Sequence, residues 1–255
     1  MGLPDEVPIM ASGLPGSTGD EWFEPTDWGL IEAARSPDSG PARQALANIC
    51  ASYWYPLYAY IRRRGYPADL AQDLTQGFFV NLLRRDFLCT VGPEKGRFRS
   101  YLLAACQHYL SNQRDHDRAV KRGGRIVVLS FDLPDAEGRY ACEPAHDLTA
   151  ERLFERRWAL TLLERVLGQV GGEMGRAGKG ELFDCLKPAL LGDGREAPYA
   201  EVAARLGMSV DAVKMAALRF RSRFRELIRA EVARTVGPGG DVDEEIRDLF
   251  ATLAT

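Results

Sequence analysis

The chain has 255 residues, of which 45% are hydrophobic and 27% are charged, and it carries a formal net charge of −3. This composition predicts a folded protein with a substantial core, and it excludes a chain coated in basic residues. Any contact with nucleic acid must therefore come from local basic patches, set against acidic segments elsewhere.

The N-terminal half is predicted to be helical after a disordered tail. Residues 1–25 are rich in Gly, Pro, Ser and acidic residues, a composition that favours disorder. Four helices are expected within residues 26–122, the first on TDWGLIEAAR and the second ending in three arginines and a glycine. The third carries apolar side chains from Leu70 to Leu82 on one face. The fourth runs through FRSYLLAACQHYLSNQRDHDRAVKR.

The C-terminal half is predicted to form a second helical unit behind a linker. Residues 123–148 mix glycines, prolines and charges around one short β-branched run, so we expect a flexible linker with one docked extended segment. Residues 149–236 open on an amphipathic helix capped by Thr149, and residues 237–255 form an acidic helix. The predicted fold class is all-α: two helical bundles joined by a flexible linker, with a helix-turn-helix in the second.

The stretch YAEVAARLGMSVDAVKMAALRFRSRFRELI has the layout of a helix-turn-helix motif. Gly207 follows the first helix, and Ser209 is placed to cap the second. The side chains of the second helix predicted to face the core are Val210, Val213, Ala217, Phe220, Phe224 and Leu227. The predicted DNA-binding residues on the adjacent face are Lys214, Leu218, Arg221 and Arg225, with Ser209 at the cap. The alternative is a solvated arginine-rich helix surface.

A second basic element lies at the end of the predicted fourth helix. Its predicted DNA-binding residues are Asn112, Arg114, Arg118, Lys121 and Arg122. They follow the aromatic residues Phe98, Tyr101 and Tyr109. Cations follow a nucleic-acid backbone, and aromatic rings can stack on the exposed bases of a single strand. The alternative is that the three rings are core residues at helical spacing.

These segments, in this order and with a linker between them, resemble one family. DLAQDLTQGFFVNLL, GRFRSYLLAACQHYLSNQRDHDRAVKR and the helix-turn-helix stretch together resemble the two DNA-binding domains of bacterial RNA polymerase sigma factors of the extracytoplasmic-function (ECF) type. The resemblance covers roughly residues 41–230. It implies a factor that binds core RNA polymerase and directs promoter recognition and DNA opening during transcription initiation.

The resemblance also implies roles for individual segments. Residues 69–83 would bind the clamp helices of the polymerase β′ subunit, residues 107–122 would hold the melted strand, and the helix-turn-helix would read the upstream duplex. The predicted polymerase-binding residues are Asp69, Asp73, Gln76 and Phe79. The expected partners are core RNA polymerase, through its β′ and β subunits, and promoter DNA. An anti-sigma protein or a Ser/Thr kinase are further candidate partners.

The sequence departs from the family pattern at two helices. Gln72 and Gly77 stand where we expect carboxylates, and Met215 and Ala216 stand where the family often has a polar residue and an arginine. Thr75 is a candidate phosphorylation site, since a phosphate there would add about −1.5 to −2 charges. The alternative is an ordinary hydroxyl on the helix surface.

The acidic segment GDVDEEIRDLFATLA is an addition to the minimal two-domain design. It could fold back over a basic surface and restrain it. The alternative is a helix that simply caps the domain.

Two other classes of function compete with a sigma factor. A helix-turn-helix transcription regulator that never binds polymerase explains the second half of the chain equally well. An enzyme is not expected, because no phosphate-binding GxxxxGK[ST] motif is present and the three histidines lack ligand-like spacing, except for His108 and His116, eight apart in the basic helix, which are expected to be surface or DNA-facing side chains. We expect no cofactor and no metal, and the five scattered cysteines indicate reduced thiols in a cytoplasmic protein. No apolar run approaches the roughly 20 residues that span a bilayer, so no membrane segment is expected.

Overall fold

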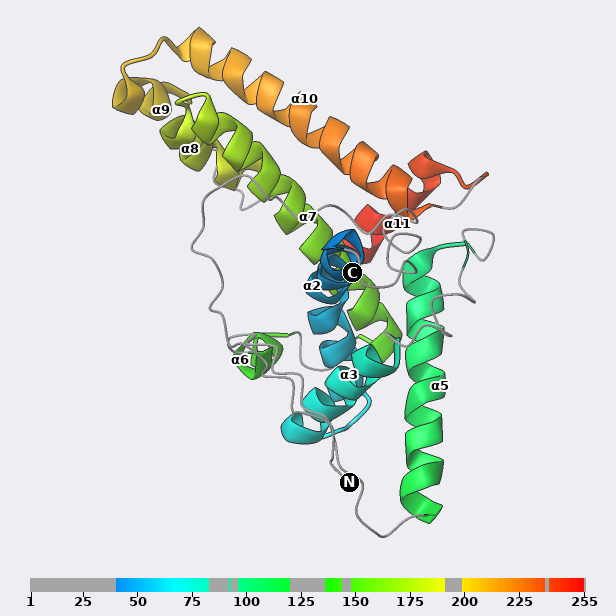
Figure 1. Ribbon diagram of the computed structural model, residues 1–255. Helices are drawn as coiled ribbons and strands as arrows, with labels where there is room; N and C mark the ends of the chain where they lie inside the picture. The colour runs from blue at the N-terminus through cyan, green and yellow to red at the C-terminus, as the bar shows by residue number, and fades with distance from the viewer. Residues whose placement is uncertain are drawn as a thin grey trace, which may run out of the picture.

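The computed structural model describes residues 40–82, 92, 96–119, 136–143, 148–190, 199–236 and 239–254. Every regular element in these residues is an α-helix, which confirms the predicted all-α class (Figure 1). The predicted tail, the predicted helix on TDWGLIEAAR and most of the predicted linker lie outside the described residues. The helices are α2 (Gly40–Arg63), α3 (Ala68–Leu82), α5 (Phe98–Ala119), α6 (Ala136–Ala141), α7 (Ala150–Arg176), α8 (Gly180–Leu190), α9 (Tyr199–Leu206), α10 (Val210–Thr235) and α11 (Val242–Leu253).

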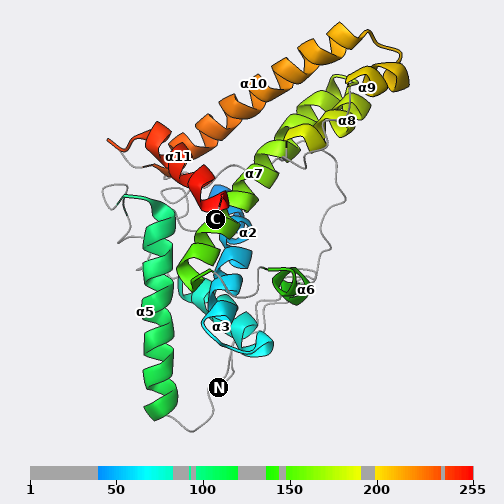
Figure 2. The ribbon, with the colours of Figure 1, turned by 180° about the vertical axis from the view of Figure 1, so that it is seen from behind.

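Helix α7 is the long central helix against which other helices pack. Its 27 residues make a rod about 40 Å long. The hydroxyl of Thr149 caps the helix as predicted, accepting a hydrogen bond of 3.2 Å from the amide of Arg152. The apolar stripe from Leu153 to Val170 is buried. In both views α2 packs on one half of this rod, while α8 and α10 pack on the other half (Figures 1 and 2).

The predicted arrangement in two separate bundles is not confirmed, because α7 packs against helices of both halves. One side chain shows this directly. Arg165 of α7 donates to the Ser52 hydroxyl of α2 at 3.0 Å and lies 3.4 Å from the Glu231 carboxylate of α10. Burial lowers the pKa of Arg165 and raises the pKa of Glu231, so this contact belongs to the interior.

The three arginines at the end of α2 bind three different segments. Arg62 donates to the Glu137 carboxylate of α6 at 2.6 and 2.9 Å, and this bond lowers the pKa of Glu137. Arg63 reaches the carbonyl of Leu148 at 3.3 Å, just before α7. Arg64 lies 3.6 Å from Glu151 in the first turn of α7. These arginines therefore serve the fold by tying the later chain to α2.

The described part of the predicted linker contains a docked helix. The hydroxyls of Tyr55 and Tyr58 in α2 donate to Glu143 at 2.7 Å and to Glu137 at 2.5 Å. The guanidinium of Arg139 lies 4.0 Å from the centre of the Tyr55 ring. Residues 136–143 are therefore fixed on an aromatic face of α2, and the β-branched run RIVVL lies outside the described residues.

Helix α5 buries one narrow apolar stripe. Phe98, Leu102, Cys106 and Leu110 recur every fourth residue and are all buried. Phe98 is thus a core residue, which confirms the alternative interpretation for this ring. Tyr109 lies against α3, where its ring is 5.8 Å from that of Phe78.

The close approach of α5 to α3 explains the glycine at position 77. A Cβ atom there would overlap with the Tyr109 hydroxyl oxygen. We expect Gly77→Ala to lower the free energy of unfolding by about 1–3 kcal/mol, measured by urea denaturation, because the Tyr109 ring must move. Gly175→Ala is the matched control, since nothing lies within 4 Å of that position in α7. The control should be neutral or stabilise by up to about 1 kcal/mol, and equal stability of the two variants would contradict this packing.

Candidate nucleic-acid interface

Helices α9 and α10 are joined by a tight, well-defined turn. Gly207 has a φ of +63°, a left-handed conformation that glycine adopts without strain. The amide of Met208 donates back to the carbonyl of Ala203 at 2.9 Å. The Ser209 hydroxyl accepts from the amide of Ala212 at 3.2 Å, so this side chain caps α10 as predicted. The geometry is a short helix, a turn and a capped long helix.

The core face of α10 follows the predicted spacing beyond its first turn. Val213, Ala217, Phe220 and Leu227 are buried, and Phe224 is half-buried. The prediction is wrong for Val210, which is 39% exposed. It is the first residue of α10, so the neighbouring helices do not cover it.

The predicted DNA-binding row lies on the outer surface of α10. Lys214, Leu218 and Arg225 are exposed, and Arg221 is half-buried. Lys214 lies 3.6 Å from Asp211, whose side chain is almost fully exposed. Within the part of the chain that the structure describes, Arg221 and Arg225 have no ion pair. The row therefore presents positive charge that the protein itself leaves largely uncompensated.

Arg223 has a different role from its basic neighbours. Its guanidinium donates two hydrogen bonds of 2.9 Å to the carboxylate of Glu173 in α7 and also reaches Glu226 at 3.2 Å. The bond to Glu173 raises the pKa of Arg223, and the same bond lowers the pKa of Glu173. Arg223 thus holds α10 against α7.

An apolar groove of about 630 Å³ lies beside the row, between the end of α7, α8 and the first turns of α10. Its lining residues include Met174, Met208, Met215, Ala216 and Arg219. Met215 and Ala216, the two departures from the family pattern, therefore face this groove. Sequence reasoning missed the groove, since its walls come from three helices that are distant in sequence.

The predicted strand-binding residues of α5 are only partly described. Asn112 is exposed, as is His108 one turn earlier. Arg114 is exposed but donates to the Tyr66 hydroxyl at 2.7 Å, with its guanidinium 5.2 Å from the ring centre. Arg118 belongs to α5, but its side chain lies outside the described residues, as do Lys121 and Arg122.

The predicted polymerase-binding residues divide into two pairs. Asp69 and Asp73 are exposed on α3, next to the 42% exposed Leu70. Gln76 is 5% exposed and Phe79 is fully buried, because this face of α3 packs into the core. The structure therefore places Gln76 and Phe79 beneath the surface, where a partner cannot reach them.

Thr75 is in the core of the protein. It has no exposed surface, and its hydroxyl donates to the carbonyl of Ala71 at 2.7 Å. Both sequence-based interpretations placed this hydroxyl on the helix surface, and its burial contradicts that placement. A kinase cannot reach Thr75 in this conformation.

Comparisons with protein-family models, with curated proteins and with solved structures each find no match. Among the described residues, no group of three His, Cys, Asp or Glu side chains could hold a metal ion. No described helix combines the length and the apolar character that crossing a bilayer requires.

Proposed function

We propose that the chain is a sigma factor that binds core RNA polymerase and directs promoter recognition and DNA opening. The observation that carries this proposal is the exposed, largely uncompensated cation row on α10, behind a capped turn. Lys214 and Arg225 would bind phosphates of the upstream duplex, with Arg221 beside them. Leu218 is 57% exposed and lies between these cations, where it would contact the DNA groove.

The two proposed DNA-binding surfaces, on α5 and on α10, lie beside opposite halves of α7. The exposed side of α5, with His108 and Asn112, would face the opened strand near the start site. Taking a base out of the stack costs a few kcal/mol, so a protein that captures the opened base favours melting. The rigid α7 would hold this helix at a set distance from α10.

Two surfaces are available for the polymerase. The exposed patch of Asp69, Leu70 and Asp73 on α3 would contact the β′ clamp helices. The apolar groove beside Met215 would suit a contact with the β subunit, because exposed apolar patches mark protein interfaces. Gln76 and Phe79 would support α3 from inside.

One observation favours the second candidate, a free-standing transcription regulator. With Gln76 and Phe79 buried, the proposed polymerase surface keeps only two of its four predicted residues. A regulator of this kind would bind duplex promoter DNA by itself.

Run-off transcription separates the two candidates. Purified protein is combined with core RNA polymerase from its own host on a library of host promoters. The Lys214→Ala/Arg221→Ala variant is assayed in the same way. A sigma factor gives specific starts that require the added protein and that weaken in the variant. Tight duplex binding without polymerase, together with no initiation, would establish the regulator instead.

A further inference from the structure

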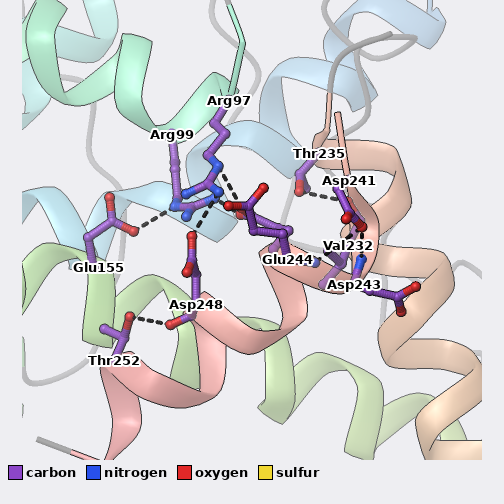
Figure 3. Close-up of polar contacts among 11 residues, drawn as sticks. Arg97, Arg99, Glu155, Val232, Thr235, Asp241, Asp243, Glu244, Asp248 and Thr252 are labelled. Atoms are coloured by element: carbon purple, nitrogen blue, oxygen red, sulfur yellow. Dashed lines mark hydrogen bonds and ion pairs between the residues drawn. The ribbon is translucent and has the colours of Figure 1, made fainter. Parts of the chain in front are cut away.

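The acidic C-terminal helix folds back onto the start of α5. The Asp241 carboxylate caps α11 by accepting from the amides of Asp243 and Glu244 at 2.8 and 3.3 Å. The helix then packs on α7 and α10, and the arginines at the start of α5 reach toward it (Figure 3). Its buried residues are Glu245 and Leu249, so only one apolar side chain of α11 is fully removed from water.

The partly buried Val242, Ile246 and Leu253 also pack against the core, and ion pairs add to this apolar contact. Arg97, just before α5, lies 2.6 Å from Glu245 and donates to Asp248 at 2.8 Å. Arg99, in the first turn of α5, also binds Glu245. At the other end of α11, Asp243 accepts from Arg229 of α10. A helix held in this way is sensitive to salt and to competing polyanions.

The arginines at the start of α5 need negative partners. The first turn of α5 holds no acidic residue, and cations are unfavourable at the positive end of a helix dipole. Glu245 and Asp248 neutralise this site. Phosphate groups would do the same, since arginine binds carboxylate and phosphate oxygens in one forked geometry.

The site also has an opening. A cavity of about 340 Å³ lies beside it, and its lining includes Arg97, Arg99 and the exposed Arg152 together with Asp248. A phosphate can therefore approach Arg97 and Arg152 while α11 is still in place, whereas Arg99 is buried until α11 leaves. Arg99 would stay oriented without α11, because Glu155 binds it at 2.5 Å and the Trp158 ring centre lies 4.2 Å away.

We propose that α11 is an internal competitor for nucleic acid: Glu245 and Asp248 cover a phosphate-binding site formed by Arg97 and Arg99. The site takes the backbone of the opened DNA strand when α11 leaves, which extends the strand-binding surface of α5 toward its N-terminus. This inference rests on the proposed function, and it adds self-inhibition and two further DNA ligands to it.

The test is the affinity of the full chain for a fluorescent forked oligonucleotide, a duplex with a single-stranded arm, measured by anisotropy at about 0.1 M salt. Glu245→Gln/Asp248→Asn should bind at least about fivefold more tightly than the wild type. Glu181→Gln/Glu244→Gln removes the same amount of negative charge from two exposed side chains, on α8 and α11, for which the described residues show no ion pair, and it should stay within about twofold of the wild type. Adding Arg97→Ala to the first variant should remove its gain.

Two further measurements keep a folding effect apart from a binding effect. Thermal unfolding of each variant shows whether the fold is intact. Hydrogen exchange in residues 240–255 should rise when the oligonucleotide is added to the wild type. Equal affinity of wild type and Glu245→Gln/Asp248→Asn would overturn this inference alone and leave α11 a structural cap. Absence of binding by every variant would overturn the proposed function as well.

Discussion

Replacing Lys214 and Arg225 by alanine is expected to weaken binding of duplex promoter DNA by about 1–3 kcal/mol per contact, roughly 5- to 150-fold each. Both side chains are exposed, and neither helps to hold the core of α10. Since each phosphate contact releases counterions, the double variant should also reduce the slope of log affinity against log salt by about 2. The measurement is a salt titration by fluorescence anisotropy.

The matched control is Lys187→Ala, an exposed cation on α8 that lies outside the predicted row. It should leave both the affinity and the salt slope within experimental error. An equal loss in the control would mean that the affinity for DNA depends only on the net charge of the protein. Arg223→Ala should behave differently again, because losing its bond to Glu173 loosens α10 from α7 and lowers the unfolding temperature.

Local sequence signals predicted the helices well. The period of apolar residues gives α7 and α10, and the hydroxyls of Thr149 and Ser209 cap them as expected. These features depend on residues a few positions apart, so a short stretch of sequence is enough to predict them. The composition of the linker region concealed α6, whose position depends on contacts with α2 instead of its own periodicity.

The contacts between distant segments could not be predicted in the same way. Arg97 and Arg99 look like free cations in sequence, yet the carboxylate of Glu245 lies 146 positions after Arg99. No local pattern reveals which acid reaches which base across such a distance. The same holds for Arg165, whose partners Ser52 and Glu231 come from opposite halves of the chain.

Helix α3 shows a further limit of periodicity. Its apolar side chains span more than one face, and the structure buries Thr75, Gln76 and Phe79 together with Leu74 and Phe78. Spacing alone says which residues share a face, but the position of the neighbouring helices decides which faces are covered. This is why part of the predicted polymerase surface lies in the core.

Because Thr75 is buried, we expect Thr75→Glu to lower the free energy of unfolding by about 3–5 kcal/mol. The carboxylate would enter a site with no exposed surface, and the hydrogen bond from the Thr75 hydroxyl to Ala71 would be lost. A buried charge without a partner is costly, whereas Thr75→Ser keeps the hydroxyl and should cost far less. Urea denaturation measures both variants.

Gln72→Glu is the matched control, since it adds the same charge to an exposed position of the same helix. It should leave stability nearly unchanged, and it restores a carboxylate where the family pattern expects one, so binding to core polymerase should increase. Thr75→Glu should give no such gain, because its charge disrupts the core on which α3 rests. A stable Thr75→Glu protein with raised polymerase affinity would show that α3 readily exposes residue 75. Thr75 would then again be a candidate phosphorylation site.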